Sequence, residues 1–211
     1  IVLSGSPPSS FVDLARRNGQ PLIVIGRSEP DCDHVRIDNE GAAREAAALF
    51  VARGFHRLGL AGSASRTPSL IEREDAFRDE AARLGAEVIS ARGDDSDYPG
   101  GLEAARQLLD QGRPEAIFCV NDPIAFGVMD YARATARLAI PDDLAVIGFD
   151  DVPEADWQAY RLTTFRQDPA AMAEAAVSFL DLRHADLTRP PARAVLAAPI
   201  VIRRSFAPAT A

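Results

Sequence analysis

The chain has 211 residues, of which 47% are hydrophobic, and it carries a formal net charge of −8. This length accommodates either one large domain or two lobes of roughly 100 residues each. A strongly acidic surface repels phosphate backbones, so we expect no nucleic-acid binding by this chain itself. No segment reaches the roughly 18 consecutive apolar residues that a membrane-spanning helix needs, so we expect no membrane partner.

Two cysteines, Cys32 and Cys119, lie far apart in the chain and lack the spacing of metal ligands. They do not form a disulfide framework, which favours a reducing compartment, and we expect a cytoplasmic protein. The first residue is Ile1 rather than Met, and it opens an apolar run. We therefore expect the chain to be a fragment of a longer protein.

Apolar runs of strand length alternate with helical patterns along the chain. The predicted strands cover Ile1–Leu3, Leu22–Ile25, Arg57–Ala61, Glu87–Ser90, Ala116–Val120 and Ala145–Phe149. The predicted helices cover Phe11–Asn18, Glu40–Arg53, Ile71–Leu84, Gly100–Gln111, Ile124–Ala134 and Ala170–His184. This alternation predicts an α/β fold, with a parallel sheet that carries helices on its faces.

The stretch from Ala42 to about Phe149 is a complete run of alternating strands and helices. The segments before and after it are too small to bury separate cores, so we expect them to combine into a second lobe. The predicted N-terminal lobe comprises residues 1–37 and about 167–192. The predicted C-terminal lobe comprises residues 38–166 and about 193–211, with crossings near Arg36–Ile37 and Leu162–Arg166.

Two adjacent carboxylates, Asp150 and Asp151, follow the apolar run Leu144–Ile147 and Gly148. A run that is apolar at every position is typical of a parallel strand buried on both faces. Ligands bind open α/β sheets at the carboxyl ends of such strands, so we expect Asp150 to point into a cleft. An equally good interpretation is that both aspartates cap the next turn.

Asn121 and Asp122 follow another buried run, Ala116–Val120, and precede a helix. An Asn in this place is able to donate to and accept from neighbouring hydroxyls of a polyol. Asn and Asp are also favoured helix caps. We assign the cap to Asp122 and the ligand-facing role to Asn121.

Arg73 lies early in the predicted helix Ile71–Leu84, after a Gly- and Ser-rich loop at residues 62–69. A guanidinium in this place is able to bind two ligand oxygens. The alternative is a solvated Arg paired with a neighbouring carboxylate of the same helix, and composition alone favours it. Trp157, the single tryptophan, is either a platform for a sugar face or a plug in the core or at a lobe interface.

The three histidines, His34, His56 and His184, are scattered, so we expect no metal site. The sequence contains no nucleophile elbow, no dinucleotide-binding glycine loop and no P-loop. We therefore expect neither a cofactor nor an enzymatic activity.

Several segments, in this order, resemble the effector-binding core of the lactose-repressor/galactose-repressor family of bacterial transcription regulators. The matching pieces are PLIVIGR (21–27), VRIDNEGA (35–42), ARGFHRLGLAG (52–62), Arg73 with Phe77, AIFCVND (116–122), PDDLAVIGFDD (141–151), LTTFRQ (162–167) and PIVIRRS (199–205). The combination of PDDLAVIGFDD with LTTFRQ is the most specific of them.

The resemblance implies a class I periplasmic-binding-protein-like fold, in which three crossover segments join two Rossmann-like lobes and an effector binds between them. It also implies a homodimer or tetramer that binds operator DNA through an N-terminal helix-turn-helix, which we expect upstream of Ile1. A periplasmic sugar-binding receptor of a transport system has the same fold and remains the alternative. A Rossmann-type enzyme is a third interpretation.

Within the family, the ligand contacts fall on Arg73, Ser69, Asn121 and Asp150 of this chain. Asp150 would accept two hydroxyls, Asn121 would bridge neighbouring ones, and Arg73 would donate a fork. Gly26 stands where some members of the family place an acidic contact, and Arg27 follows it. An Arg there suits an acidic ligand, so the expected effector is a sugar, a sugar phosphate or a sugar acid.

Overall fold

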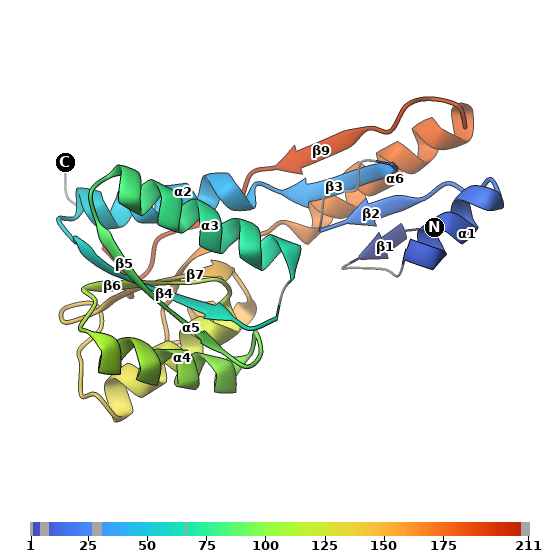
Figure 1. Cartoon of the computed structure of the whole chain (residues 1–211). Helices are drawn as coiled ribbons and strands as arrows, with labels where there is room; N and C mark the ends of the chain where they lie inside the picture. The colour runs from blue at the N-terminus through green and yellow to red at the C-terminus, as the bar shows by residue number, and fades with distance from the viewer. Residues whose placement is uncertain (1, 5–8, 27–30, 66, 208–211) are drawn as a thin grey trace. The chain divides into compact units, whose positions relative to one another are not determined.

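The structure is a computed structural model, and it describes all residues except 1, 5–8, 27–30, 66 and 208–211. The chain divides into two compact units. The smaller unit comprises residues 1–38 and 168–198, and the larger unit comprises residues 39–167 and 199–211. Figure 1 follows the chain through the elements of each unit.

The larger unit is built on a six-stranded sheet with the strand order β10-β8-β7-β6-β4-β5. All neighbouring strands are parallel except β10, which runs antiparallel to β8. Helices α2 and α3 cover one face of the sheet, and α4 and α5 cover the other (Figure 1). The strands are β4 (Arg57–Ser63), β5 (Glu87–Gly93), β6 (Ala116–Cys119), β7 (Ala145–Asp150), β8 (Thr163–Arg166) and β10 (Ile200–Val201). The helices are α2 (Asn39–Ala52), α3 (Pro68–Arg83), α4 (Tyr98–Gln111) and α5 (Asp122–Ala134), and the short 3₁₀ helix η1 covers Pro153–Asp156.

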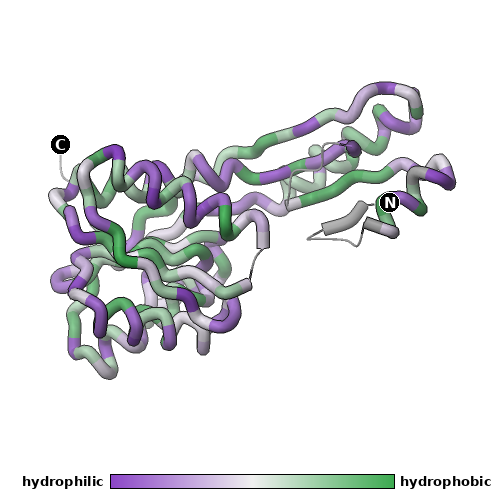
Figure 2. Tube along the Cα trace, viewed as in Figure 1, coloured by the Kyte–Doolittle hydropathy of each residue, from purple (hydrophilic) through white to green (hydrophobic). Residues whose placement is uncertain are grey.

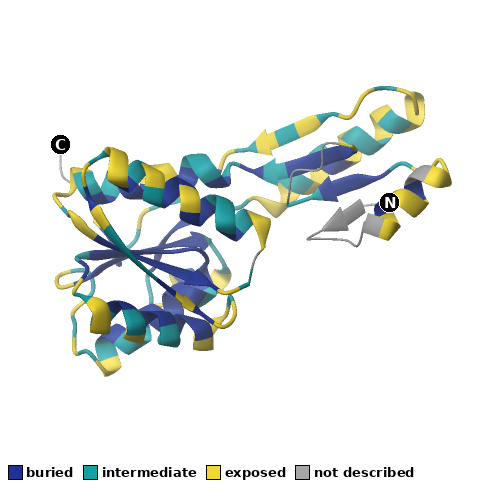
Figure 3. Ribbon diagram, viewed as in Figure 1, coloured by how far each residue is buried: buried dark blue, intermediate teal, exposed yellow. Residues whose placement is uncertain are grey.

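The core of this unit lies on both faces of its central strands. Every residue of β6 is buried, and β7 is buried from Ala145 to Phe149. Phe118 of β6 stacks on Phe77 of α3, with ring centroids 5.0 Å apart. Figure 3 shows the central strands buried between helices whose outer faces are exposed. The continuous apolar runs of the sequence therefore form strands covered on both sides, as predicted.

The smaller unit contains a four-stranded parallel sheet with the order β1-β2-β3-β9. Its strands are β1 (Val2–Ser4), β2 (Ile23–Ile25), β3 (Asp33–Ile37) and β9 (Arg193–Leu196), and its helices are α1 (Ser9–Arg17) and α6 (Pro169–Ala185). Successive residues of a strand point to opposite faces. Accordingly, Val24 packs with Val12 of α1, and Ile23 packs with Ala176 of α6. Hydrophobic residues follow the strands of each unit in Figure 2.

The division of the chain differs from the predicted one at its last boundary. The sequence predicts that residues from about 193 belong to the larger lobe, whereas β9 pairs with β3 and residues 193–198 belong to the smaller unit. Neither β9 nor β10 is among the predicted strands. The reason is that β9 is an edge strand whose residues alternate between exposed and half-buried, so it lacks a continuous apolar run. The segments predicted as crossings are strands β3 and β8, which end next to the points where the chain passes between the units.

Candidate ligand-binding site

Asp150 is the last residue of β7, at the carboxyl edge of the larger sheet. Its φ is 127° and that of Asp151 is 56°, a region of backbone conformation that non-glycine residues rarely adopt. Such conformations persist only where the surroundings fix them, and they cluster at binding sites. The Asp150 side chain is 24% exposed, and its Oδ1 accepts a hydrogen bond from Nε2 of Gln167. Burial raises the pKa of Asp150, against the opposing effect of Arg73 and Gln167.

Arg73 reaches the same edge from the second turn of α3, where its side chain is only 5% exposed. Nε donates to Oδ1 of Asn39 at 2.8 Å, and Nη1 donates to the carbonyl of Val120 at 2.7 Å. The guanidinium carbon lies 3.4 Å from the centroid of the Phe149 ring. Nη1 is also 3.6 Å from Oδ1 of Asp150. The structure therefore brings Arg73 and Asp150 together.

Composition alone favoured a solvated Arg73 paired within its own helix, and that interpretation is wrong. Arg73 is buried rather than solvated, and Asp150, which ends β7, lies within ion-pair distance of it. Burial lowers the pKa of Arg73 to about 10, and the negative charge of Asp150 opposes this shift. At neutral pH the guanidinium is thus still protonated, and it is held in a fixed orientation by Asn39, Val120 and Phe149.

Asn121 and Asp122 have the opposite roles from those predicted for capping. Asn121 is the N-cap of α5, because its Oδ1 accepts the backbone N–H of Ile124 at 2.9 Å. Its Nδ2 donates to the carbonyl of Ser96 at 2.9 Å. Asp122 is the first helical residue instead. One N–H of the Asn121 amide remains for a ligand, since Nδ2 carries two.

The side chain of Asp122, which sequence reasoning missed as a site residue, is fully buried beneath this edge. It accepts hydrogen bonds from Oγ1 of Thr164, at 2.6 Å, and from the backbone N–H of Val152, at 3.0 Å. Burial raises the pKa of Asp122 to about 7, although these two hydrogen bonds oppose the shift. The signal in the sequence was its position directly after a buried strand, which favours a cap as much as a site.

Asn39 and Gln167 are two further polar groups of the site for which no role was predicted. Asn39 is almost fully buried and donates to Oε2 of Glu72 at 2.8 Å while it accepts from Arg73. Gln167 ends the LTTFRQ segment and donates to Asp150. Both residues lie in segments that carry the family resemblance, and that is the signal by which they could have been found.

The remaining candidates are less closely tied to this cluster. Ser69 lies in the first turn of α3 rather than in the preceding loop, four residues before Arg73 and hence on the same helix face. Trp157 follows η1 and is 56% exposed, so within the larger unit it is not a core plug. Arg27 lies outside the described residues.

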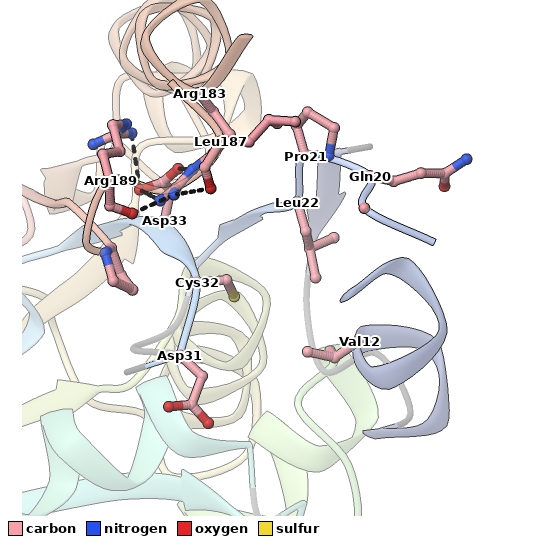
Figure 4. Close-up of a pocket in the computed structure, with 12 residues that line it drawn as sticks. Val12, Gln20, Pro21, Leu22, Asp31, Cys32, Asp33, Arg183, Leu187 and Arg189 are labelled. Atoms are coloured by element: carbon pink, nitrogen blue, oxygen red, sulfur yellow. Dashed lines mark hydrogen bonds and ion pairs between the residues drawn. The ribbon is translucent and has the colours of Figure 1, made fainter. Parts of the chain in front are cut away.

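A pocket of about 290 Å³ lies elsewhere, in the smaller unit at the amino ends of β2 and β3 (Figure 4). Its charged lining is paired internally. Asp33 accepts from Nε and Nη2 of Arg183 at 3.0 and 2.9 Å, and Nη2 of Arg189 is 2.9 Å from the same carboxylate. Burial alone would raise the pKa of Asp33, but these arginines and the N–H of Ala192 hold it below its ordinary value. We do not regard this clamp as a ligand site, because Asp33 already balances the charge of Arg183 and Arg189 in its lining.

Neither a metal-binding cluster nor a membrane-spanning helix is found among the residues that the structure describes. No group of three or more His, Cys, Asp or Glu side chains in this part of the chain is arranged to hold a metal ion. Within the same residues, every helix is too short or too polar to cross a membrane.

The chain thus has a largely parallel α/β sheet with a fixed guanidinium and a partly exposed carboxylate at its carboxyl edge, the edge at which open α/β sheets bind ligands. Residues 24–206 match the family described as a periplasmic binding protein-like domain. The chain belongs to this family. The expected periplasmic-binding-protein-like fold is thereby confirmed.

The curated relatives of this chain include several bacterial regulators. The HTH-type transcriptional regulator CelR of Thermobifida fusca is 28% identical over 195 residues, which cover 89% of this chain and 57% of CelR. The ribose operon repressor of Escherichia coli (strain K12) is 32% identical over 167 residues, which cover 76% of this chain and 50% of the repressor. The chain thus spans about half the length of the curated relatives that it matches.

Solved structures of transcriptional regulators also resemble this chain. A complex of the transcriptional regulator CelR with cellobiose has a TM-score of 0.86 and 25% identity, over 97% of this chain and 65% of that one. A LacI transcriptional regulator from a Rhodococcus species has a TM-score of 0.86 and 27% identity, over 98% of this chain and 77% of that one. The resemblance to the lactose-repressor/galactose-repressor family is therefore confirmed.

Proposed function

We propose that this chain is the effector-binding part of a cytoplasmic transcription regulator, and that its effector is a neutral, polyhydroxylated molecule such as a sugar. The observation that carries the proposal is the pair formed by Arg73 and Asp150, 3.6 Å apart at the carboxyl edge of the sheet. A fixed guanidinium donates hydrogen bonds and a carboxylate accepts them, which is what a ring with several hydroxyls needs.

The charge balance of the site supports a neutral ligand over a phosphate or an acid. The positive charge of Arg73 is already balanced by Asp150, and the carboxyl group of Asp122 lies near the same edge. A ligand phosphate would have to approach the Asp150 carboxylate in a partly desolvated place, which is costly. Sugars also appear in the solved relatives, one of which contains cellobiose.

The remaining parts of the function follow from the relatives, which are helix-turn-helix regulators. In this proposal the protein is not an enzyme and acts as a homodimer or tetramer. Operator DNA is bound by a segment outside this chain, because an acidic chain with a net charge of −8 repels DNA. A ligand changes DNA binding only by the difference between its affinities for two conformations of the regulator.

A thermal-shift panel of sugars, sugar phosphates and sugar acids tests the proposal, since a ligand that binds the folded state raises the Tm by mass action. We expect a neutral sugar to raise the Tm and the shift to be lost in Asp150→Ala and in Arg73→Ala. Glu115→Ala is the matched control, because Glu115 accepts backbone N–H groups at the amino edge of the same sheet. If both site variants keep the full shift, the proposed site is wrong. If only phosphorylated or acidic sugars bind, the neutral ligand is wrong.

A further inference from the structure

The carboxyl group of Asp122 connects three segments that meet below the candidate site. Asp122 itself begins α5, directly after β6. It accepts one hydrogen bond from Thr164 of β8 and one from the backbone N–H of Val152, in the loop that follows β7. A buried carboxyl group with two donors from separate segments holds those segments in one arrangement, because each lost bond leaves a buried polar group unpaired.

The loop that donates this hydrogen bond contains two residues in a strained backbone conformation. Asp150 and Asp151 have φ values of 127° and 56°. The side chain of Asp151 is held by Arg166 and Arg203, at 2.6 and 2.7 Å. The contact with Val152 is different in kind, because it fixes the backbone immediately after the strained pair. A carboxylate placed by such a backbone conformation keeps its direction only while the conformation is maintained.

Gly148 shows how closely the Asp122 carboxyl group approaches β7. A Cβ atom added at Gly148 would lie 2.4 Å from Oδ1 of Asp122, far inside van der Waals contact. The glycine two residues before Asp150 therefore leaves the space that the carboxyl group occupies. Asp122 thus touches β7 on one side of Asp150, at Gly148, and bonds the loop on the other side, at Val152.

We infer that Asp122 is a positioning residue for the candidate site: it fixes the backbone around Asp150 so that the Asp150 carboxylate faces Arg73 and accepts ligand hydroxyls. Asp122 acts through Asp150 and does not itself contact the ligand. The ligand-binding part of this inference rests on the function proposed above, whereas the backbone part stands without it.

The surroundings of Asp122 favour its neutral form. Burial is the main cause of its raised pKa, and the carboxylates of Asp150 and Asp151 add to it. The charge of Asp122 in turn helps to raise the pKa of the buried Cys119 thiol of β6, and the positive charge of Arg73 from α3 attracts the ionised form of Asp122. A protonated carboxyl group still accepts the Val152 N–H through its carbonyl oxygen. The positioning role therefore needs the shape and the acceptor of Asp122 rather than its charge.

This distinction allows a test with a conservative variant. In Asp122→Asn, the amide oxygen still accepts the Val152 N–H, and the amide N–H donates to the Thr164 hydroxyl, which is able to accept. Asp122→Ala removes the acceptor of both hydrogen bonds. Glu115→Ala removes a carboxylate that also accepts backbone N–H groups, but at the amino edge of the sheet. It controls for a general loss of stability.

Amide hydrogen exchange of Val152 and the affinity for two probes, cellobiose and ribose, are measured in all four proteins. We expect the Val152 amide of the unmodified protein to exchange at least tenfold more slowly than the amides of the exposed residues Gln158 and Ala159. We expect Asp122→Ala to accelerate that exchange at least tenfold and to weaken probe binding at least tenfold. Asp122→Asn should stay within threefold of the unmodified protein in both measurements, and so should Glu115→Ala.

Fast exchange of Val152 in the unmodified protein overturns the inference, even if no variant folds. Equal losses in Asp122→Asn and Asp122→Ala also overturn it, as does unchanged exchange in Asp122→Ala. If the unmodified protein binds neither probe nor any sugar of the panel, the proposed function fails, and the exchange data alone decide whether Asp122 holds the loop.

Discussion

The Nη1 atom of Arg73 lies 3.6 Å from Oδ1 of Asp150, although the two residues come from a helix and a strand on different parts of the chain. The two charges oppose each other in a largely desolvated place, since the side chain of Arg73 is 5% exposed and that of Asp150 is 24% exposed. Asn39 and Val120 hold the guanidinium on one side, and Gln167 holds the carboxylate on the other. The pair is therefore organised before any ligand arrives, which reduces the entropy that binding has to overcome.

The first prediction concerns the stability of this pair. Asp150→Ala leaves the buried Arg73 charge without its carboxylate, and we expect it to lower the free energy of unfolding by about 3 kcal/mol. Arg73→Met leaves a partly exposed Asp150 behind instead, so its cost should be smaller, about 1–2 kcal/mol. Urea denaturation of both variants and of the double variant measures the coupling. A double variant whose loss equals the sum of the single losses would falsify a direct interaction.

The second prediction concerns Asn39, which orients Arg73. Asn39→Ala removes the acceptor of the Arg73 Nε–H and a donor to Glu72, both in buried surroundings. We expect a loss of about 1–3 kcal/mol in stability and a tenfold or larger loss of ligand affinity, measured by isothermal titration calorimetry. Asp97→Ala, which removes the N-cap acceptor of α4, is a control that should cost about 1 kcal/mol without changing the affinity. Equal effects on affinity in the two variants would contradict the assigned role.

The third prediction is a pH dependence that belongs to Asp122. Its pKa is raised by burial from 3.8 to about 7 in the folded protein. Between these two values the folded protein keeps a proton that the unfolded chain has released, so the free energy of unfolding falls as the pH rises. The loss amounts to roughly 4 kcal/mol and levels off above about pH 7.

Asp122→Asn cannot titrate and should lack this loss. Denaturant midpoints of the two proteins, measured from pH 4 to pH 8, should therefore shift in favour of Asp122→Asn as the pH rises. Other carboxyl groups titrate in both proteins and largely cancel in the difference. A difference that stays constant over this range would show that Asp122 is ionised normally in the folded protein.

The sequence was sufficient to predict the elements that are buried on both faces. The continuous apolar runs of β6 and β7 have few other structural solutions, and the polar residues that follow them do lie at one edge of a parallel sheet. The edge strands β9 and β10 were not predicted, because β9 alternates between exposed and half-buried residues and β10 has only two residues, so neither has a distinctive pattern. The resemblance to a family supplied Arg73 as a site residue, whereas local composition pointed away from it.

The roles of the individual site residues depend on the exact helix start and on contacts between distant residues, which a local sequence pattern does not contain. Asn121 and Asp122 both suit a cap, and a shift of the helix start by one residue exchanges their roles. The burial of Arg73 depends on Asp150, Asn39 and Phe149, which are distant in sequence. Likewise, the function of Asp122 depends on Thr164 and Val152, which only the folded chain brings to it.

The last prediction concerns Gly148, whose missing side chain makes room for Asp122. A Cβ atom at this position would lie 2.4 Å from Oδ1 of Asp122 and 2.9 Å from Cδ2 of Leu162. We expect Gly148→Ala to destabilise the protein by about 1–3 kcal/mol, since overpacking moves both neighbours. Gly112→Ala is the matched control, because the nearest atom to its added Cβ is the end of the Ile89 side chain, 3.5 Å away.

The clash at Gly148 also gives a reciprocal test. Shortening the neighbour in Gly148→Ala/Asp122→Ala removes the closest contact, so the double variant should lose less stability than the sum of the two single variants. Thermal unfolding of the three proteins and of Gly112→Ala measures this. Strict additivity, or a Gly112→Ala variant as unstable as Gly148→Ala, would mean that the cost at Gly148 reflects a general intolerance of alanine and not the packing of Asp122 against β7.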